Sequence, residues 1–430
     1  MIDVDRRTRF DSDAREVDFL GFHETHLPRL VERGHGELAA AGVDTLALEP
    51  LAIEVGGRAY TWRRGRYGFE AVEGDCGATA VAVMSAAAFS ELIQDRRSTV
   101  GIIIGNDVQM SRGTLRHFLE WEPIFRALVD GRRVYEPGSV VFKTEVGASL
   151  DLYRVFGADD SRAEMAHFLG EAGFLKVNGV FSSAEMAAVS NDIDVSLPSY
   201  SPDDGRSWWA RTAAGEHRAV RLQHFQEHSE TVQRLLHDER LRSIADLTLN
   251  RHREAQRLEG NAIEALVKPV GVVEGISDVS WHKDCSLGRH SYDCCRITVG
   301  ISVTDADEES GQLCVVAGSH RTNVQLRGVR DDLDLPRIGL PTRAGDITVH
   351  LSCTLHMSIP PTRRERRVLY TGFDLPPRAG EVIVDRDPLY RVRESAPKRV
   401  EELKSTSITA DGDAGEMNRF DSRGVRPVES

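Results

Sequence analysis

The run DITVHLSCTLHMS (residues 346–358) belongs to a series of short β-type segments between residues 263 and 373. Each segment is rich in β-branched, aliphatic or aromatic residues, and turns with Gly, Asp or Pro separate one from the next. The other members are IEALVKPVGVVE (263–274), RITVGISVTDA (296–306), GQLCVVAG (311–318) and RVLYTGF (367–373). Several short strands spaced by such turns predict a sandwich or jelly-roll barrel, that is, a double-stranded β-helix.

The first 145 residues have a different pattern, in which strand-like and helical segments alternate. This alternation predicts an α/β domain with one open sheet covered by helices. The strand-like runs are LALEPLAIEV (46–55), AYTW (59–62), ATAVAVMS (78–85) and STVGIII (98–104). The expected helices lie around 27–41, at AAAFSELIQD (86–95) and at TLRHFLEWEPIFRALVD (114–130).

The chain length of 430 residues favours two domains over one. We place an α/β accessory domain at 1–145, a linker at 146–160, the jelly-roll domain with its flanking helices at 161–378, and a polar C-terminal tail at 379–430. The tail is expected to be loosely held, because it is charged and has few apolar residues. The predicted fold class is therefore α+β.

Composition excludes several classes of protein. The formal net charge of −13 argues against a nucleic-acid partner, since phosphate binding needs a basic face. No apolar run is long enough to span a membrane, and the charged first residues do not resemble a signal peptide. The six cysteines show no CxxC pair and form no disulfide framework. These features predict a cytoplasmic protein.

The segment WHKDCS (281–286) places His282 and Asp284 two residues apart, next to β-type sequence. In a strand, residues i and i+2 point to the same side, so one metal ion can bind both side chains. Four other His-x-Glu pairs begin at residues 35, 228, 237 and 252, in segments with helical periodicity. In a helix such side chains diverge by roughly 200° and cannot share an ion. His282 and Asp284 are therefore the preferred pair.

Two imidazoles and one carboxylate leave open positions on an iron(II) ion, which an oxygenase needs for a chelating co-substrate and for O₂. The third ligand must come from another strand. A single histidine on a strand is more often packed or hydrogen-bonded than a metal ligand, so the pair alone does not define the site.

The order of several motifs resembles the phytanoyl-CoA dioxygenase family over about residues 160–378. These motifs are GFLKVNGVFSSAEMAAVSNDID (173–194), WHKDCS, DADEESGQLCVVAGSHR (305–321) and AGDITVHLSCTLHMS (344–358) followed by RRVLYTGF (366–373). The resemblance implies a jelly-roll oxygenase that uses iron(II), 2-oxoglutarate and O₂. It also implies that His282, Asp284 and His356 are the iron ligands. Retention of Asp284 favours hydroxylation over halogenation, because related halogenases lack this carboxylate.

The same resemblance implies a site for 2-oxoglutarate. Arg367 falls where the family has the arginine that pairs with the distal carboxylate, and Ser358 matches a serine that helps to hold it. Arg366 is adjacent and would point to the opposite face of the strand. The sequence therefore leaves open which of the two arginines binds the carboxylate. Lys268 is a candidate for contact with the co-substrate or substrate, with a solvated edge lysine as the alternative.

The sequence departs from the family pattern in two places that bear on pocket shape. Ala317-Gly318-Ser319-His320 replaces the usual Pro-Gly-Ser-His turn, and the region of Gly300 lacks an aromatic residue sometimes found there. The N-terminal domain has a pattern similar to sterol-carrier-like lipid-binding folds. An accessory domain without a ligand, including one that forms a homodimer, is the alternative.

The expected function is hydroxylation of a small, apolar or acyl-type substrate with release of succinate and CO₂. Two alternatives stay open. One is a cupin-like metal oxygenase that does not use 2-oxoglutarate, and the other is a non-catalytic lipid- or ligand-binding protein on a jelly-roll scaffold.

Overall fold

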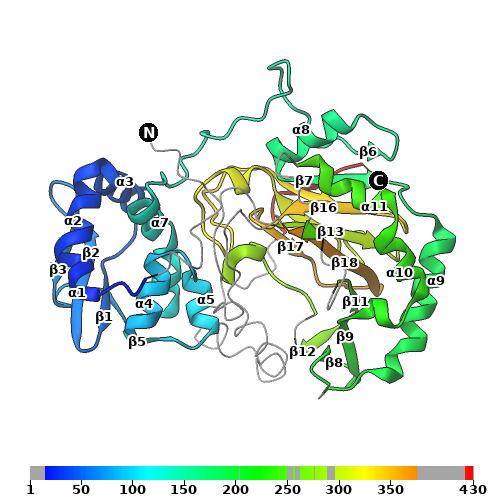
Figure 1. Ribbon diagram of the computed structural model, residues 1–430, viewed down its shortest axis with the longest axis horizontal. Helices are drawn as coiled ribbons and strands as arrows, with labels where there is room; N and C mark the ends of the chain where they lie inside the picture. Colours follow the sequence, from blue (N-terminus) through cyan, green and yellow to red (C-terminus); the bar gives the residue numbers. More distant parts are fainter. Residues whose placement is uncertain are drawn as a thin grey trace.

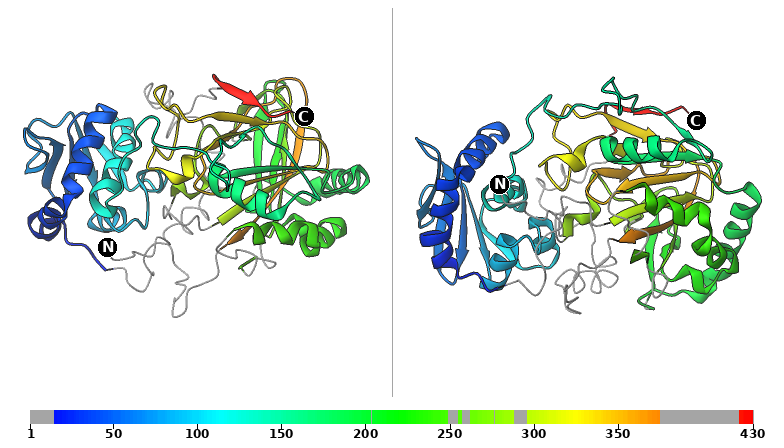
Figure 2. Two further views of the ribbon diagram at one scale, coloured as in Figure 1. Left: turned by 90° about the horizontal axis from the view of Figure 1, so that it is seen from above. Right: turned by 45° about the horizontal axis from the view of Figure 1, so that its top comes forward.

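The computed structural model describes residues 15–202, 204–248, 255–256, 262–275, 277–287, 296–374 and 422–429. Figure 1 shows an N-terminal unit beside a larger β-rich unit, with a long connecting segment between them. The two remain side by side in the other views (Figure 2). Among the described residues, no helix is both long and apolar enough to cross a bilayer.

The N-terminal unit contains a five-stranded sheet in the order β3-β2-β1-β4-β5. β1 pairs antiparallel with β2 and parallel with β4, so the chain crosses over between β3 and β4. The strands are β1 (Leu51–Val55), β2 (Arg58–Arg64), β3 (Phe69–Glu73), β4 (Ala80–Met84) and β5 (Val108–Arg112). The helical segments are α1 (Phe19–Gly21), η2 (Phe22–His26), α2 (Leu27–Leu30), η3 (Val31–His35), α3 (Gly36–Leu46), α4 (Ala86–Ile93), α5 (Thr99–Ile104), α6 (Leu115–Glu120) and α7 (Glu122–Asp130).

The predicted strand STVGIII is wrong, because residues 99–104 form the helix α5. The Ser98 hydroxyl caps this helix by accepting the Gly101 N–H at 3.2 Å. A short apolar run that is buried on all sides has the same composition in a strand and in a helix, so periodicity does not separate them. The fifth strand of the sheet is instead Val108–Arg112.

The second unit contains a large sheet whose strands follow the order β12-β8-β9-β11-β18-β13-β16-β7-β6, with β10 paired to β18. The strands are β6 (Phe156–Gly157), β7 (Phe174–Asn178), β8 (Ser207–Thr212), β9 (His217–Leu222), β10 (Ala255–Gln256), β11 (Glu264–Lys268), β12 (Val272–Glu274), β13 (Arg296–Ser302), β16 (Ile347–Leu351) and β18 (Arg366–Asp374). The pairs around β18, β13 and β16 are antiparallel.

A smaller sheet of four strands has the order β17-β14-β15-β19. Its strands are β14 (Leu313–Val316), β15 (Arg337–Leu340), β17 (His356–Ser358) and β19 (Val425–Pro427). Val315 and Ile338 of this sheet share one hydrophobic core with Val299 and Val349 of the large sheet. Two sheets around a common core are the arrangement expected of a jelly roll.

Both segments that we placed outside the jelly roll contribute to it. Phe156, within the predicted linker, is buried in the jelly-roll core, and β6 pairs with β7. Within the predicted polar tail, β19 pairs with β15, and Val428 is buried in the same core. Residues 375–421 lie outside the described part of the chain, so the rest of the tail prediction is untested. Separation along the sequence hid these pairings from the sequence analysis.

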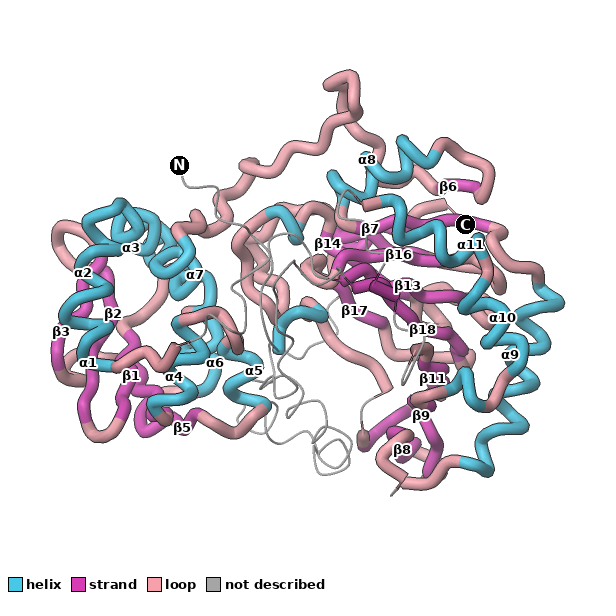
Figure 3. The backbone as a smooth tube through the Cα atoms, viewed as in Figure 1, coloured by secondary structure: helices cyan, strands magenta, loops and turns pink. Residues whose placement is uncertain are grey.

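Helices cover the outer face of the large sheet, as Figure 3 shows for α9 to α11. The helical segments are α8 (Arg162–Ala172), α9 (Ser183–Ser196), η4 (Leu197–Ser199), η5 (Phe225–Glu227), α10 (Glu230–His237), α11 (Glu239–Arg242) and η6 (Ser243–Leu247); η8 (Asp284–Leu287) and η9 (Ser319–Arg321) lie in loops between strands. Apolar side chains of these helices, such as Met186 and Leu235, join the core under the sheet.

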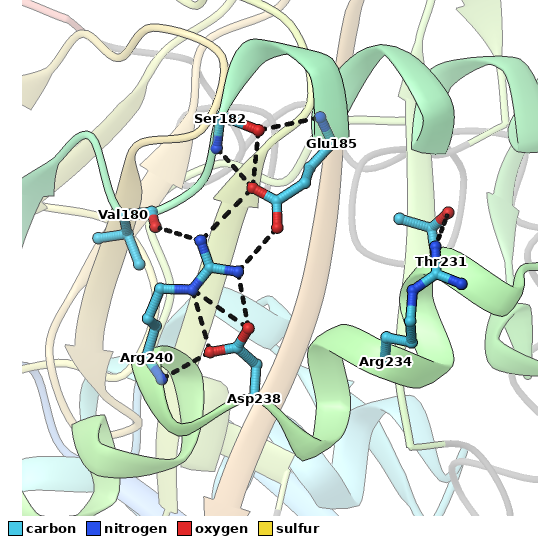
Figure 4. A network of polar contacts seen from close by, with 7 residues as sticks. All are labelled: Val180, Ser182, Glu185, Thr231, Arg234, Asp238 and Arg240. Atoms are coloured by element: carbon cyan, nitrogen blue, oxygen red, sulfur yellow. Dashed lines mark hydrogen bonds and ion pairs between the residues drawn. The ribbon is translucent and has the colours of Figure 1, made fainter.

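A network of polar contacts fixes the start of α9 (Figure 4). Ser182 and Glu185 form a capping box, as S-x-x-E spacing at a helix start favours. Arg240 donates to Glu185 at 2.7 Å and to Asp238 at 2.6 Å, and it also donates to the Val180 carbonyl at 3.1 Å. One arginine thereby ties α11 to the N-terminus of α9.

The two units meet at a loop of the jelly roll, residues 322–333. The Asn323 amide donates to the Pro123 carbonyl at 2.8 Å, and the Tyr135 N–H donates to the Asn323 carbonyl at 3.0 Å. A mainly apolar cavity of about 130 Å³ lies in this junction, lined among others by Leu46, Val134 and Leu355. This volume is comparable to cavities that hold a benzene molecule, and it is small for a lipid.

Candidate metal and co-substrate site

His282 and His356 lie opposite each other in the jelly roll. The N–H of each donates to the carbonyl of the other at 2.9 Å, which forms an antiparallel bridge. We expected His282 and Asp284 on one strand, but only His282 forms a β-bridge, and Asp284 begins the turn η8. The two side chains still converge, because the chain turns directly after the bridge.

The imidazole rings are oriented by carbonyl groups of their own segments. His282 Nδ1 lies 2.7 Å from the Ser280 carbonyl, and His356 Nδ1 lies 3.0 Å from the Thr354 carbonyl. These contacts fix Nδ1 as the protonated nitrogen of each neutral ring and leave Nε2 as the free donor atom.

The remaining donor atoms form a cluster. The distance from Asp284 Oδ1 to Nε2 is 3.6 Å for His282 and 3.4 Å for His356. The candidate ligand atoms of these three residues all lie within 4.8 Å of one another. Two imidazoles and one carboxylate that converge in this way have the donor set of non-haem iron(II) oxygenases.

The second oxygen of Asp284 is held by the large sheet. Thr298 Oγ1 on β13 donates to Oδ2 at 2.9 Å, and His350 Nε2 on β16 lies 3.3 Å from the same atom. Thr298 and His350 are paired in register, so they reach Asp284 from adjacent strands. Thr298 carried no motif that would have identified it from the sequence.

The charges in this cluster are unequal. Burial lowers the pKa of both His282 and His350 to about 4, so these rings are neutral at pH 7. Burial opposes the charge on Asp284, but His356 and the three histidine contacts bring its pKa well below the ordinary value. The pKa of His356 is raised by Asp284, despite its burial. A metal ion at this site would therefore compete with a proton on His356.

Arg366 on β18 is a buried arginine that contacts β17, the strand of His356. Its side chain is 2 % exposed, and Nη1 donates to the Gly311 carbonyl at 2.6 Å and to Ser358 Oγ at 3.3 Å. Ser358 lies two residues after His356 on β17, so both side chains point to the same side. Lys268 pairs with Arg366 in register and is buried, with Nζ 2.8 Å from Asp278 Oδ1. It is not a solvated edge lysine.

The structure corrects the assignment of Arg367. This side chain points to the outer face of the sheet, where it contacts Asp194 of α9 at 2.8 Å and Glu365 at 2.9 Å. Its guanidinium therefore forms ion pairs with carboxylates of the protein itself, on the face of the sheet opposite the metal cluster. Arg366, the alternative that the sequence had left open, is the one of the two that contacts Ser358.

The surroundings of Arg366 fit a bound carboxylate. Its Nε is buried without a hydrogen-bond partner. Among the described residues, no carboxylate lies within ion-pair distance of its guanidinium. Burial of a guanidinium that lacks an ion pair costs free energy unless an anion binds to it. A carboxylate is a suitable anion, because a guanidinium binds it in bidentate fashion. The distal carboxylate of 2-oxoglutarate has the matching chemistry.

Gly300 lies on the same inner face, between β16 and β18. A Cβ atom there would lie 2.9 Å from Thr348 Oγ1 and 3.0 Å from Tyr370 Cε1. The Tyr370 ring of the neighbouring strand therefore lies across the glycine.

A two-sheet β fold with a His-Asp-His cluster and a buried arginine defines the class of iron- and 2-oxoglutarate-dependent oxygenases. Comparison with protein families agrees, because residues 169–368 match the phytanoyl-CoA dioxygenase (PhyH) family. This part of the chain is a PhyH family domain, and the protein is an oxidoreductase of the 2-oxoglutarate-dependent class that uses iron(II), 2-oxoglutarate and O₂. The family prediction is confirmed. A comparison with curated proteins found no match.

Several solved structures are similar to part of this chain. The epimerase SnoN in complex with Fe³⁺, α-ketoglutarate and nogalamycin RO is 22% identical, over 50% of this chain and 83% of SnoN, with a TM-score of 0.39. EvdO2 from Micromonospora carbonacea var. aurantiaca with 2-oxoglutarate is 22% identical, over 54% and 97%, with a TM-score of 0.39. HygX from Streptomyces hygroscopicus with nickel and 2-oxoglutarate is 19% identical, over 49% and 86%, with a TM-score of 0.35.

Proposed function

We propose that the protein hydroxylates a small organic substrate, of apolar or acyl type, with release of succinate and CO₂. In this proposal His282, Asp284 and His356 hold iron(II). The observation that carries it is the convergence of Asp284 Oδ1 with the Nε2 atoms of both histidines, at 3.6 and 3.4 Å. Retention of the carboxylate favours hydroxylation over a reaction in which chloride occupies that position.

Arg366 and Ser358 are the proposed anchor for the distal carboxylate of 2-oxoglutarate. Lys268 lies beside Arg366, and Asp278 balances its charge through the 2.8 Å contact. Burial lowers the pKa of Lys268, and the contact with Asp278 opposes this effect. In this proposal Lys268 is the residue beside the anchor that contacts the co-substrate or the substrate.

Iron(II) with 2-oxoglutarate and O₂ supplies the oxidising power when it is bound. The protein's part is to orient the donors and to exclude water. His282 and His356 present Nε2 because their Nδ1 atoms are held by carbonyls, and Asp284 presents Oδ1 because Thr298 and His350 occupy Oδ2. Such supporting contacts set the direction of each ligand.

The test is formation of succinate from 2-oxoglutarate under air with added iron(II). We expect wild-type protein to produce succinate, and the His282→Ala and Asp284→Ala variants to produce none above background. Full turnover by Asp284→Ala would show that this carboxylate is not a ligand. A screen of metabolite extracts for increased succinate release would then identify the substrate, with hydroxylation read from a product 16 mass units heavier, the mass of one added oxygen atom.

Arg366 also distinguishes the proposal from a cupin-like oxygenase that works without 2-oxoglutarate. Such a protein has no need for a buried guanidinium beside the third ligand. Titration of 2-oxoglutarate into anaerobic protein with iron(II) should produce a visible charge-transfer band, and that band should be absent without the co-substrate.

The N-terminal unit gives limited support to a lipid-carrying role. Its core is filled with buried aromatic side chains, including Trp62, Phe89 and Phe125. We propose an accessory role for this unit and keep a homodimer contact through it as a secondary candidate. Cys285, Cys314 and Cys353 are buried. A cytoplasmic location stays a proposal from the sequence.

A further inference from the structure

The N-terminal unit touches the chain segment that carries Asp284. Ser98 is fully buried, and its hydroxyl donates to the Ser286 carbonyl. Ser286 lies two residues after Asp284, inside the turn η8, and α5 packs against this turn. A single short 3₁₀ turn has little stability of its own, so its neighbours fix its position.

A second contact reaches the residue between the two candidate ligands. Leu326 belongs to a loop of the jelly roll, but its side chain is buried in the hydrophobic core of the N-terminal unit. The Leu326 carbonyl accepts the Lys283 N–H at 3.0 Å. The next residue, Arg327, is bridged to His282. The position of Leu326 in the N-terminal core therefore sets the position of the backbone at residues 282–283.

These two contacts are independent, because one comes through α5 and the other through the N-terminal core. Asn323, three residues before Leu326, is also hydrogen-bonded to the N-terminal unit through Pro123 and Tyr135. The 323–327 loop is therefore attached to the N-terminal unit at Asn323 and Leu326, while the Leu326 carbonyl holds the ligand segment at Lys283.

We propose that the N-terminal unit is a structural part of the metal site, with Ser98 and Leu326 as positioning residues for Asp284 and His282. Neither side chain touches a candidate ligand atom. Their effect is to hold the main chain of residues 282–286 so that the His282 and Asp284 side chains converge. This inference rests on the proposed metal site, and it gives the N-terminal unit a role in the activity of the jelly-roll domain.

The test uses the full chain and Mn²⁺, a redox-inert divalent ion, with binding followed by loss of the free-ion EPR signal. We expect Ser98→Ala and Leu326→Ala to weaken Mn²⁺ binding by roughly tenfold, the lower end of the effect of removing a supporting contact. Leu326→Val is a milder variant in case the alanine protein does not fold. The KM for 2-oxoglutarate should rise in parallel, because that ligand chelates the same ion.

Matched controls separate positioning from general loss of stability. Ser85 caps α4 in the same unit, accepting the Ala88 N–H at 3.1 Å, and Leu128 is fully buried in the same core. Ser85→Ala and Leu128→Ala should lower the melting temperature comparably and leave Mn²⁺ affinity at the wild-type value. Equal losses of affinity in the controls, or wild-type affinity in Ser98→Ala and Leu326→Val, would overturn the inference.

His282→Ala distinguishes this result from failure of the proposed function. If wild-type protein binds Mn²⁺ and His282→Ala does not, the site is established whatever the positioning variants show. If wild-type protein does not bind Mn²⁺, or binds it equally well without His282, both the proposed site and the inference are wrong.

Discussion

His282 and His356 exchange two main-chain hydrogen bonds of 2.9 Å across an antiparallel bridge. This reciprocal pair places both imidazoles on one side, although the two residues are far apart in the sequence. Two ligands of the proposed site are therefore fixed by backbone pairing, while the third, Asp284, depends on the turn that follows and on side-chain contacts. Asp284 is accordingly the ligand whose position should be most sensitive to substitutions around it.

The contact of Thr298 with Asp284 leads to a prediction about metal affinity. Thr298→Val removes the 2.9 Å hydrogen bond to Oδ2 and keeps the shape of the side chain. We expect Mn²⁺ or iron(II) affinity to fall by about 10- to 100-fold, as for other residues that hydrogen-bond to a metal ligand. Isothermal titration with Mn²⁺ measures this change.

Thr371→Val is the matched control for that experiment. Thr371 Oγ1 is also buried and donates to the Ala262 carbonyl at 2.8 Å, away from the metal cluster. Its loss should reduce stability without a change in metal affinity. Equal affinities for the Thr298 and Thr371 variants would argue against a role for Thr298 in orienting Asp284.

The opposite orientations of Arg366 and Arg367 predict opposite phenotypes. Arg366→Lys should raise the KM for 2-oxoglutarate by about tenfold or more, because a charge-assisted hydrogen bond of about 1.5–3 kcal/mol is lost. Arg367→Lys should leave that KM unchanged, since its partners are Asp194 and Glu365. Steady-state succinate assays at varied 2-oxoglutarate decide between them, and the reverse pattern would restore Arg367 as the anchor.

His23 in the N-terminal unit predicts a loss of stability at mildly acidic pH. It is buried, accepts the Trp62 indole N–H at 2.9 Å, and burial lowers its pKa to about 4 from 6.5. Because the folded pKa lies below the unfolded value, stability is full above pH 6.5 and falls between pH 6.5 and 4. The total is about 3 kcal/mol for this shift.

His23→Gln offers the comparison, because its amide can accept from Trp62 and does not titrate. Thermal unfolding of wild type and His23→Gln between pH 4 and 7.5 should give curves that converge toward the acidic end. Parallel curves across this range would mean that His23 does not titrate as its burial implies.

The network in Figure 4 predicts a second pH-dependent effect at lower pH. Contacts with Arg240 and Ser182 lower the pKa of Glu185 to about 2, so its stabilising effect is full above about pH 4.5 and is lost as pH falls toward 2. Arg240→Ala should reduce the free energy of unfolding by about 1–2 kcal/mol at neutral pH, as expected for loss of a helix cap and partly exposed ion pairs.

Arg234→Ala is a suitable control for Arg240→Ala, since Arg234 contacts only Thr231 among the residues drawn, at 3.2 Å. Denaturant unfolding should show little change for this variant. The difference between Arg240→Ala and wild type should shrink as pH falls below 4.5, and a constant difference would remove Glu185 from the explanation.

The sequence alone indicated a β-rich second domain and the family to which it belongs. Short β segments with turn residues predicted the jelly roll, and the β-type surroundings of WHKDCS separated His282 and Asp284 from four helical His-x-Glu pairs. His356 and Ser358 followed from the family resemblance, and the structure brings all of them together. The i, i+2 geometry of a strand did not carry this information, because Asp284 lies in the turn η8 and converges with His282 only after the chain turns.

Tertiary structure alone decided which arginine faces the site. Alternation along a strand places Arg366 and Arg367 on opposite faces, but only the pairing of β18 with β11 and β13, and the packing of α9 on the outside, shows which face is inner. The same holds for the helix at 99–104, for β19 in the small sheet, and for the contacts of Ser98 and Leu326 with the ligand segment. Each depends on contacts between residues distant in sequence, which local propensity and periodicity do not encode.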